Sequence, residues 1–415
     1  MSVIDPQRRL LCTAIAAGGI MSAIPTWAKL NFAKNDFSWS RIFENLSESQ
    51  RGLLLDPTRE IQILYTQIDR DSEGGIKLEH HAFHHAPKRW FFPASTIKLP
   101  IALLACEEVA RVGGNLESAI MLRQSPETGI WADAEPLSES LRRSLCRTFT
   151  VSDNIPYNRF YELLGPDKIH ARLKALGCPN TRAITRLGSR DTEANRRTGS
   201  VQIIDVDGKP LAGIAPRVAK KRGFPFGKAL KGEGFVGDDG VLIPGEHDFS
   251  FGNFMPLADL HQMLVAFICP QAVLASQRWK IPGEWREDIL KEMGRFPRES
   301  TEPVYPAPEY YDAYAKFFVL GGNKQDAPEG FRSYGKTGEA YGYLSDSSYL
   351  VDQGTGSECF LSTVIHCNPD GIYNDDKYDY EEIGLPFLAA LGKSVLAFEA
   401  SRKNSLRLNV PSGFK

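Results

Sequence analysis

The sequence predicts an α/β (α+β) fold in which an antiparallel sheet, flanked by helices, is formed from both ends of the chain. Two strand patterns joined by the turn "SEGG" lie near the N-terminal end, at residues 61–69 and 76–83. Two more, "SSYLVD" and "CFLSTVIH", lie near the C-terminal end, and helical patterns fill the region between the two pairs. This order of strands, helices, strands and helix predicts one sheet with an all-helical lobe inserted in its middle.

Helical periodicity is clearest at residues 98–112, where the run ends in a Gly-Gly pair that is a suitable helix stop. Further helices are predicted at "LSESLRRSLCRTF", "PYNRFYELLG" and "MPLADLHQMLVAFI", with a terminal helix at "EEIGLPFLAALGKSVLAFE". Near residue 196 the composition shifts to Gly, Lys and Pro, and "VQIIDVDGKPLAGI" predicts a small hairpin. We therefore expect one domain at residues 35–400, made of a sheet lobe (about 35–95 and 300–400), a helical lobe (about 98–270) and an atypical insert (about 196–254).

Charge and the N-terminal segment limit the classes of function and the location. A formal net charge of -2 over 415 residues gives no reason to expect binding to nucleic acid or to an anionic membrane. Arg8 and Arg9 precede an apolar run that ends in "PTWA", which predicts a signal peptide at residues 1–28 and fits twin-arginine export; a helix packed on the domain is the alternative. No later segment is long and apolar enough to span a bilayer, so we expect a soluble monomer, periplasmic or secreted.

The cysteines, the histidines at 80–85 and the glycines at 232–237 could suggest binding sites, but we expect each group to have a structural role. The cysteines beyond the signal lie in apolar surroundings typical of core thiols; if one bridge forms, we expect it between Cys106 and Cys146. The histidines of "HHAFHH" (80–85) would alternate between the two faces of a strand, which disfavours a metal site. "GEGFVG" (232–237) has the spacing of a dinucleotide-binding loop without the flanking strand and helix, so we expect a flexible loop and no cofactor.

Ser95 and Lys98 in "FFPASTIKLP" form a candidate catalytic pair. If a helix begins near Ser95, positions i and i+3 share one face, which brings the lysine amine within reach of the serine oxygen. The helix N-terminus also favours the negative charge that develops on a nucleophile. However, a Ser-x-x-Lys spacing arises easily by chance, and Ser412 with Lys415 matches it too. The pair alone does not establish a nucleophile and its base.

Two rarer tripeptides strengthen the interpretation. Ser152-Asp153-Asn154 and Lys336-Thr337-Gly338 follow Ser95 and Lys98 in the order S-x-x-K, S-D-N, K-T-G. Together with the segments "FPASTIKLP", "LSESLRRSLCRTFTVSDN" and "TRLGSRDTEAN", they make residues 35–400, apart from the insert, resemble the class A β-lactamase-like serine hydrolases of the β-lactamase and penicillin-binding protein superfamily. The resemblance implies that fold and an acyl-enzyme mechanism without a metal or other cofactor.

The resemblance also assigns roles to the catalytic side chains. Ser95 would be the acylated nucleophile and Lys98 its base or proton relay, with a pKa lowered by burial and by Lys336. Ser152 would pass the proton to the leaving nitrogen. Backbone N–H groups of Ser95 and Glu339 would form the oxyanion hole.

The implied substrate contacts come from the other two motifs. Asn154 would bind the side-chain amide of a small-molecule substrate, and Lys336 and Thr337, followed by Gly338, would bind its carboxylate. The expected substrate is a β-lactam or a D-Ala-D-Ala-like peptide.

Two departures from the family bear on turnover. Where class A enzymes carry the glutamate that positions the deacylating water, alignment on "TRL" places Asp191, with Glu193 as the rival two residues on. Ser345 stands near the place where many members have an arginine that grips the substrate carboxylate. Three hypotheses therefore remain: a β-lactamase with slow deacylation, a D-Ala-D-Ala peptidase or small-ester hydrolase, and a non-catalytic binding protein on the same fold.

Overall fold

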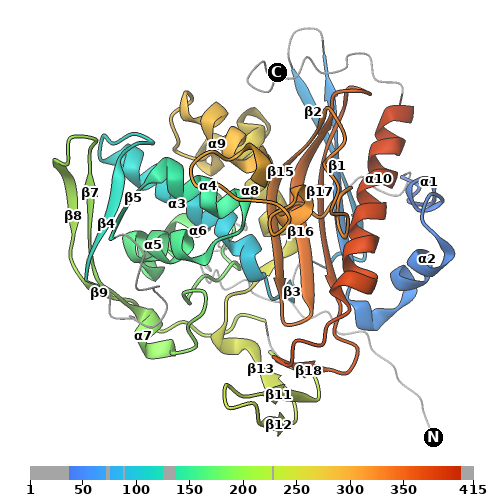
Figure 1. Ribbon diagram of the computed structural model, residues 1–415, viewed down its shortest axis with the longest axis horizontal. Coiled ribbons are helices and arrows are strands. Elements are labelled where there is room, and N and C mark those ends of the chain that lie inside the picture. Colours follow the sequence, from blue (N-terminus) through green and yellow to red (C-terminus); the bar gives the residue numbers. More distant parts are fainter. Residues whose placement is uncertain (1–36, 72–74, 87–88, 125–136, 227–228, 403–415) are drawn as a thin grey trace, which may run out of the picture.

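The central element of the structure is a five-stranded antiparallel sheet with strand order β15-β16-β17-β1-β2 (Figure 1). The computed structural model describes residues 37–71, 75–86, 89–124, 137–226 and 229–402. Pairing of β1 with β17 joins the two ends of the chain, which confirms the predicted fold class. The strands are β1 (Gln62–Arg70), β2 (Ile76–Phe83), β15 (Phe331–Ala340), β16 (Tyr343–Asp352) and β17 (Ser357–His366).

Helices cover both faces of this sheet. On one face lie α1 (Ser40–Phe43), α2 (Glu48–Leu55) and α10 (Leu385–Ser401), and on the other lies α8 (Leu257–Ile268) with the helical lobe (Figure 1). A separate hydrophobic core fills each side, so the apolar residues on both faces of β17 are buried. Among the described residues, one helical stretch, Tyr380–Ser401, is long and apolar enough to cross a membrane, and 67% of its apolar 18-residue window is buried against the protein, as in a core helix.

The inserted lobe contains the predicted helices and a small sheet that was not predicted. Its helices are α3 (Lys98–Arg111), α4 (Leu141–Thr150), α5 (Asn154–Leu164), α6 (Pro166–Leu176), α7 (Thr192–Arg196) and α9 (Trp285–Gly294). The expectation of an all-helical lobe is corrected by a four-stranded sheet, β5-β4-β7-β8, whose hairpin β7–β8 was predicted. The other two strands were missed because β4, "AIMLRQ", does not alternate apolar and polar residues and β5 has only three residues. These strands are β4 (Ala119–Gln124), β5 (Ser138–Ser140), β7 (Ser200–Ile204) and β8 (Pro210–Ile214).

The remaining strands are short, and among their pairings that of β11 with β18 joins the insert to the C-terminal part of the described chain. The loop expected at "GEGFVG" is instead a strand, β11, which pairs with β12 and with β18 near the C-terminal end. A Cβ atom on Gly232 would lie 2.4 Å from the carbonyl oxygen of Gly371, so the glycine there permits close strand approach. The strands are β3 (Trp90–Phe91), β6 (Arg197–Thr198), β9 (Arg217–Val218), β10 (Leu230–Lys231), β11 (Gly234–Val236), β12 (Leu242–Pro244), β13 (His247–Asp248), β14 (Met255–Pro256) and β18 (Ile372–Tyr373).

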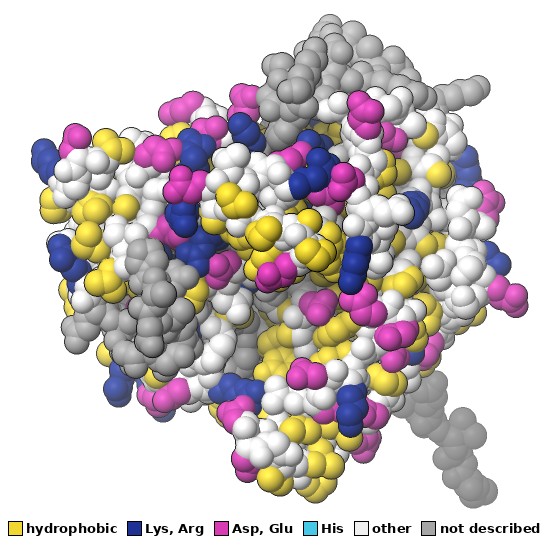
Figure 2. Space-filling model, in the orientation of Figure 1, with side chains coloured by type: hydrophobic (Ala, Val, Ile, Leu, Met, Phe, Trp, Pro, Cys, Tyr) yellow, Lys and Arg dark blue, Asp and Glu magenta, His cyan; other side chains and the backbone are white. Residues whose placement is uncertain are grey.

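A half-buried ion pair anchors the insert to the segment that leads into β1. Nζ of Lys231 lies 2.6 and 2.7 Å from the two carboxylate oxygens of Glu60 and above the rings of Trp90 and Tyr343. The far end of the insert, with β11 and β12, forms the lower end of the molecule in Figure 1. Figure 2 shows hydrophobic side chains at the surface of this end. The insert is therefore fixed at its base, beside the edge of the sheet.

Other sequence predictions can be placed on this fold. Cys106 and Cys146 are both free and buried, as are the other four described cysteines, which confirms the interpretation as core thiols. His80 bonds to Thr66 at 2.6 Å, whereas its neighbour His81 stacks on Phe37, so the two rings do lie on opposite faces of β2. No group of metal-ligating side chains occurs among the residues that the structure describes. The predicted signal peptide at residues 1–28 lies outside the described residues.

Candidate active site

Ser95 lies in a short 3-10 turn, Ala94–Ile97, that leads directly into α3. The N–H and the hydroxyl of Thr96 both bond to the carbonyl oxygen of Pro93, at 2.9 and 2.6 Å, which closes the turn. Ala94 has a positive φ of 45°, a conformation that costs energy for a residue with a side chain. This strained turn leaves Ser95 half-buried beside the edge strand β15.

The glycine of Lys336-Thr337-Gly338 explains how β15 comes so close to this turn. A Cβ atom on Gly338 would lie 2.5 Å from the carbonyl oxygen of Pro93 and 3.0 Å from the nitrogen of Thr96, so no larger residue fits. Because β15 is the edge of the sheet, half of its backbone N–H groups have no partner strand on their side. The backbone around Glu339 therefore lies in the right place to supply a donor next to Ser95.

Lys98 is fully buried and surrounded by polar atoms of the other motifs. Its Nζ lies 2.8 Å from Oγ of Ser95, 3.2 Å from Oγ of Ser152 and 2.7 Å from Oδ1 of Asn154, and it also donates to the backbone oxygen of Ser152. Burial lowers the pKa of Lys98 to about 7, although the charge of Asp153 opposes this shift. Near neutral pH about half of these amines are uncharged, which is the form that accepts a proton.

The Ser-Asp-Asn segment is shaped by the loop between α4 and α5. Asp153 caps α5 through a bond from the N–H of Ile155, and Arg147 holds its carboxylate at 2.9 and 2.6 Å. Ser152 has a positive φ of 60°, which turns it and Asn154 toward Lys98 on either side of the cap. Asp153 thus has a structural role as the helix cap, and Ser152 and Asn154 face Lys98.

Lys336 completes the group. Its Nζ donates to Oγ of Ser152 at 2.7 Å and to the carbonyl oxygen of Thr337 at 2.9 Å. Since Lys98 contacts the same hydroxyl, Ser152 bridges the two amines. The pKa of Lys336 lies well below its usual value because of burial and the nearby charges of Lys98 and Lys316.

Sequence analysis missed Lys316 and Asp346, which lie behind this group. Lys316 is buried, donates to the carbonyl oxygen of Phe149 at 3.2 Å, and has its pKa lowered by burial to about 8. Burial raises the pKa of Asp346 to about 6, even though two backbone N–H groups bond to its carboxylate. Neither residue belongs to a recognisable motif, and only the tertiary structure shows that they influence the charge of Lys336.

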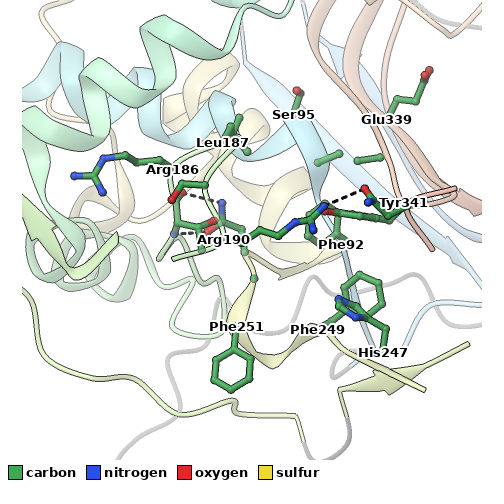
Figure 3. A pocket seen from close by; sticks show the side chains of 18 of the residues that line it. Phe92, Ser95, Arg186, Leu187, Arg190, His247, Phe249, Phe251, Glu339 and Tyr341 are labelled. Carbon is green, nitrogen blue, oxygen red and sulfur yellow. Dashed lines mark hydrogen bonds between the residues drawn. The ribbon is translucent and has the colours of Figure 1, made fainter. Parts of the chain in front are cut away.

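A cavity of about 770 Å³ opens from Ser95, with Asn154 and Glu339 also in its wall (Figure 3). It extends between the 185–192 loop, the insert and the end of β15, and in Figure 2 hydrophobic side chains gather in the hollow between the lobe and the sheet. The side chains of Lys98, Ser152 and Lys336 are not part of the cavity wall. The nucleophile therefore lies between a buried proton-transfer group on one side and a large cavity on the other.

The structure does not bring Asp191 or Glu193 to Ser95. Asp191 is the N-cap of α7, where one carboxylate oxygen accepts from the N–H groups of Glu193 and Ala194 at 2.9 Å. Glu193 binds Arg196 at 2.5 Å and Lys221 at 3.3 Å, and these partners lower the pKa of its exposed carboxyl. Neither carboxylate lines the cavity. The structure shows no contact of either carboxylate that supports the deacylating role expected from the sequence.

The loop that carries these residues is held by a buried ion pair. Arg186 bonds through Nε and Nη2 to one oxygen of Glu162, at 2.9 and 2.7 Å, and through Nη1 to the carbonyl oxygen of Ala194. The other oxygen of Glu162 accepts from the N–H of Gly199 at 2.8 Å.

Ser345, which the sequence places near the position of the family's carboxylate-binding arginine, lies on β16 opposite Gly338. Its hydroxyl donates to the carbonyl oxygen of Gly338 at 3.4 Å.

Comparison with known proteins supports the resemblance found in the motifs. Residues 56–206, which include Ser95, Lys98 and Ser152, match the model of the beta-lactamase enzyme family. No curated protein matches the chain.

Among solved structures, a β-lactamase from Sphaerobacter thermophilus aligns at 13% identity over 89% of this chain and 100% of its own, with a TM-score of 0.48. A β-lactamase from Desulfarculus baarsii aligns at 14% identity over 87% of this chain and 98% of its own, with the same TM-score of 0.48. The protein PBP-A aligns at 15% identity over 84% of this chain and 96% of its own, with a TM-score of 0.47.

Proposed function

Residues 56–206 carry a match to the beta-lactamase enzyme family, and on this premise we propose that the protein is an acyl-serine hydrolase with Ser95 as its nucleophile. The observation that carries the proposal is the position of Lys98. Its amine is buried within hydrogen-bonding distance of both Ser95 and Ser152. A binding protein has no need for a half-neutral lysine between two hydroxyl groups, so this arrangement favours catalysis over the non-catalytic hypothesis.

The proposed reaction begins when neutral Lys98 takes the proton of Ser95 as its oxygen attacks the substrate carbonyl carbon. Backbone N–H groups of Ser95 and Glu339 stabilise the oxyanion. Lys98 then returns the proton through Ser152, 3.2 Å away, to the leaving nitrogen as the C–N bond breaks. Water attacks the resulting ester and regenerates the free serine. The proton-transfer steps use side chains that already lie within hydrogen-bonding distance of one another.

Lys336 acts on the leaving side of the substrate in this proposal. Its Nζ binds Ser152 at 2.7 Å, so a positive charge on Lys336 would favour transfer of the serine proton, and Thr337 follows it along the edge strand. A substrate carboxylate bound there would itself restore the charge of Lys336, because a nearby anion raises the pKa of an amine. The low pKa of Lys336 in the free protein is therefore compatible with anion binding.

We propose β-lactam hydrolysis with slow deacylation as the activity. Support for slow turnover comes from the positions of Asp191 and Glu193, because no described carboxylate from that loop lines the cavity. The same observation favours a D-Ala-D-Ala peptidase or small-ester hydrolase as the second candidate, since hydrolysis of its natural acyl-enzyme would not depend on a carboxylate from that loop. Export to the periplasm or medium remains our proposal from Arg8, Arg9 and the apolar run after them.

Intact-mass measurement after incubation with a penicillin and, separately, with a D-Ala-D-Ala peptide tests these alternatives. A long-lived penicillin adduct that disappears in Ser95→Ala supports the first proposal. An adduct or turnover with the peptide alone supports the second. If neither compound reacts with the folded protein, the non-catalytic hypothesis replaces both.

A further inference from the structure

A second, smaller cavity lies between α7, the insert and the start of α6, next to the cavity at Ser95. Its volume is about 190 Å³, which is below the roughly 300 Å³ at which pockets for drug-sized molecules begin. Thr185, Thr192 and Phe251 line both cavities, so the two are neighbours. A space of this size suits an ion or one small chemical group.

The wall of this second cavity carries an excess of positive charge, and we call it the basic cavity. Its described lining residues include five cationic side chains and one carboxylate, namely Arg182, Arg196, Lys220, Lys221 and Arg222 with Glu193. Glu193 pairs with Arg196 and Lys221. Arg222 pairs with Asp167, which is outside the wall, at 2.7 Å. Two carboxylates do not balance five cations, so the basic cavity keeps a net positive charge.

Arg182 supplies a buried cation to the wall and has no acidic partner. The residue is 6% exposed, and its Nη1 and Nη2 donate to the carbonyl oxygens of Gly223 and Arg222 at 2.9 and 2.8 Å. Burial and the charge of Arg222 lower the pKa of Arg182 to about 10, and no carboxylate of the described chain opposes this shift. The Nε atoms of both arginines are buried without an acceptor among the described groups. Because buried charges are normally paired, an uncompensated guanidinium here favours an anionic ligand.

Lys220 and Lys221 add two cations at the exposed side of the basic cavity. Both residues are exposed, and Nζ of Lys221 lies 3.3 Å from Oε1 of Glu193. Lys220 contacts Asp167 through its backbone N–H at 3.2 Å, and within the described part of the chain its amine belongs to no ion pair. An anion that enters from solvent therefore meets the amine of Lys220 before it reaches the guanidinium of Arg182.

We propose that the basic cavity binds a small dianionic oxyanion of the phosphate class, either free phosphate or the phosphate group of a monoester. Two negative charges compensate the excess better than chloride or a single carboxylate does. Arginine forks and lysine amines are the side chains that phosphate oxygens prefer. Because one water takes up about 30 Å³ of liquid, the volume holds one phosphate group with a few water molecules. The proposal goes beyond the acyl-serine function and does not depend on it.

Glu193 gives the proposal a test with an unusual sign. Its carboxylate pairs with Arg196 and Lys221, two of the cations that an entering anion would contact. Removal of this carboxylate should therefore strengthen phosphate binding, whereas damage to the fold would weaken it. We expect Glu193→Gln to lower the Kd for phosphate about twofold to fivefold, the range for an exposed ion pair.

Titration calorimetry on the full chain at pH 8, where a phosphate group carries about two charges, measures the binding. Sodium phosphate should show one saturable site, and sodium chloride at the same ionic strength should show none. Methyl phosphate distinguishes the two sources of the ligand. Equal binding of methyl phosphate supports a monoester as the ligand, and binding of inorganic phosphate alone supports the free ion.

Variants of the wall locate the bound ion. Lys220→Gln should raise the Kd for phosphate about fivefold or more, and Arg182→Gln about tenfold or more. Lys209→Gln is the matched control, because Lys209 is an exposed lysine of the same insert outside the wall, and it should keep the parent Kd. Since Arg182 also holds Gly223, Lys220→Gln decides the question if Arg182→Gln does not fold.

A last variant separates the basic cavity from the catalytic lysines. Lys336→Ala should bind phosphate as tightly as the parent, because Lys336 does not line the basic cavity. Loss of binding in Lys336→Ala places the ion at the catalytic site and overturns the proposal. A parent protein without saturable phosphate binding overturns it as well, as does a Kd that is unchanged in both Lys220→Gln and Glu193→Gln.

Discussion

Nζ of Lys98 lies 2.8 Å from Oγ of Ser95, one helical turn away and inside the protein. A lysine in water is almost entirely charged at neutral pH and cannot accept a proton. Here burial brings the pKa of Lys98 down to about 7, so the same side chain becomes available as a base. The short distance allows proton transfer between Ser95 and Lys98, and burial makes the neutral, proton-accepting form of Lys98 available.

Acylation should therefore rise with pH across neutrality. With the pKa of Lys98 at about 7, the neutral fraction increases from about a tenth at pH 6 to about nine tenths at pH 8. We expect the rate constant for penicillin adduct formation to increase roughly ninefold over this interval and then level off. Time-resolved intact-mass measurement at a series of pH values checks this, and a rate that is flat or falling contradicts a lysine base.

Removal of Lys98 should slow acylation more than removal of Lys336. Lys98→Ala deletes the proton acceptor, which is worth on the order of a thousandfold. Lys336→Ala deletes a substrate contact and a partner of Ser152, and we expect a loss on the order of tenfold to a hundredfold, mostly in KM. Single-turnover kinetics on both variants, with melting temperatures as a check of folding, measure the two effects. Equal losses would show that the two amines do not have separate roles.

Loss of the loop carboxylates should leave both acylation and slow turnover nearly unchanged. Asp191→Asn keeps a good N-cap, because Asn and Asp serve that position about equally, so α7 should stay folded. Glu193→Gln removes only exposed ion pairs. For each variant we expect a stoichiometric penicillin burst and a steady phase within about twofold of the parent. If Asp191→Asn abolishes the steady phase, its carboxylate does position the deacylating water.

The ion pair between Arg186 and Glu162 should dominate the stability of the loop beside the cavity. Both side chains are fully buried, and Arg186→Met would remove the guanidinium that is in contact with the Glu162 carboxylate, at a cost of about 3–5 kcal/mol in the free energy of unfolding. Arg190→Met is the control in the same loop, because the side chains of Arg190 and Asp238 are 46% and 83% exposed. That change should cost less than about 1 kcal/mol. Urea denaturation measures both, and similar losses would refute the distinction.

Sequence patterns predicted those parts of the site that depend on local geometry. Ser95 and Lys98 are one turn apart, and the positions of Ser152 and Asn154 around Asp153 follow from an N-cap that spans adjacent residues. Such relationships need no knowledge of distant segments. The order of strands and helices likewise predicted the sheet from both ends of the chain.

The parts that sequence patterns missed depend on contacts between distant segments. Lys316 and Asp346 matter because tertiary packing buries their charges near Lys336, and no local pattern marks this. β11 and its local partner β12 have three residues each, too few for a strand pattern, and the other partner of β11, β18, lies near the other end of the chain. The side-chain direction of Asp191 depends on where α7 begins, which the spacing from the Ser-Asp-Asn motif does not determine.

The sheet built from both chain ends also governs when activity can appear during synthesis. Ser95 and Lys98 leave the ribosome long before β15, which supplies Lys336 and the backbone next to Glu339. A topology with such high contact order folds slowly, since its ends must meet before the long-range pairs form. A nascent or truncated chain that lacks β15 and the strands after it thus carries a serine without Lys336 and without the backbone donor near Glu339. The nucleophile gains its reactivity only when the C-terminal strands dock.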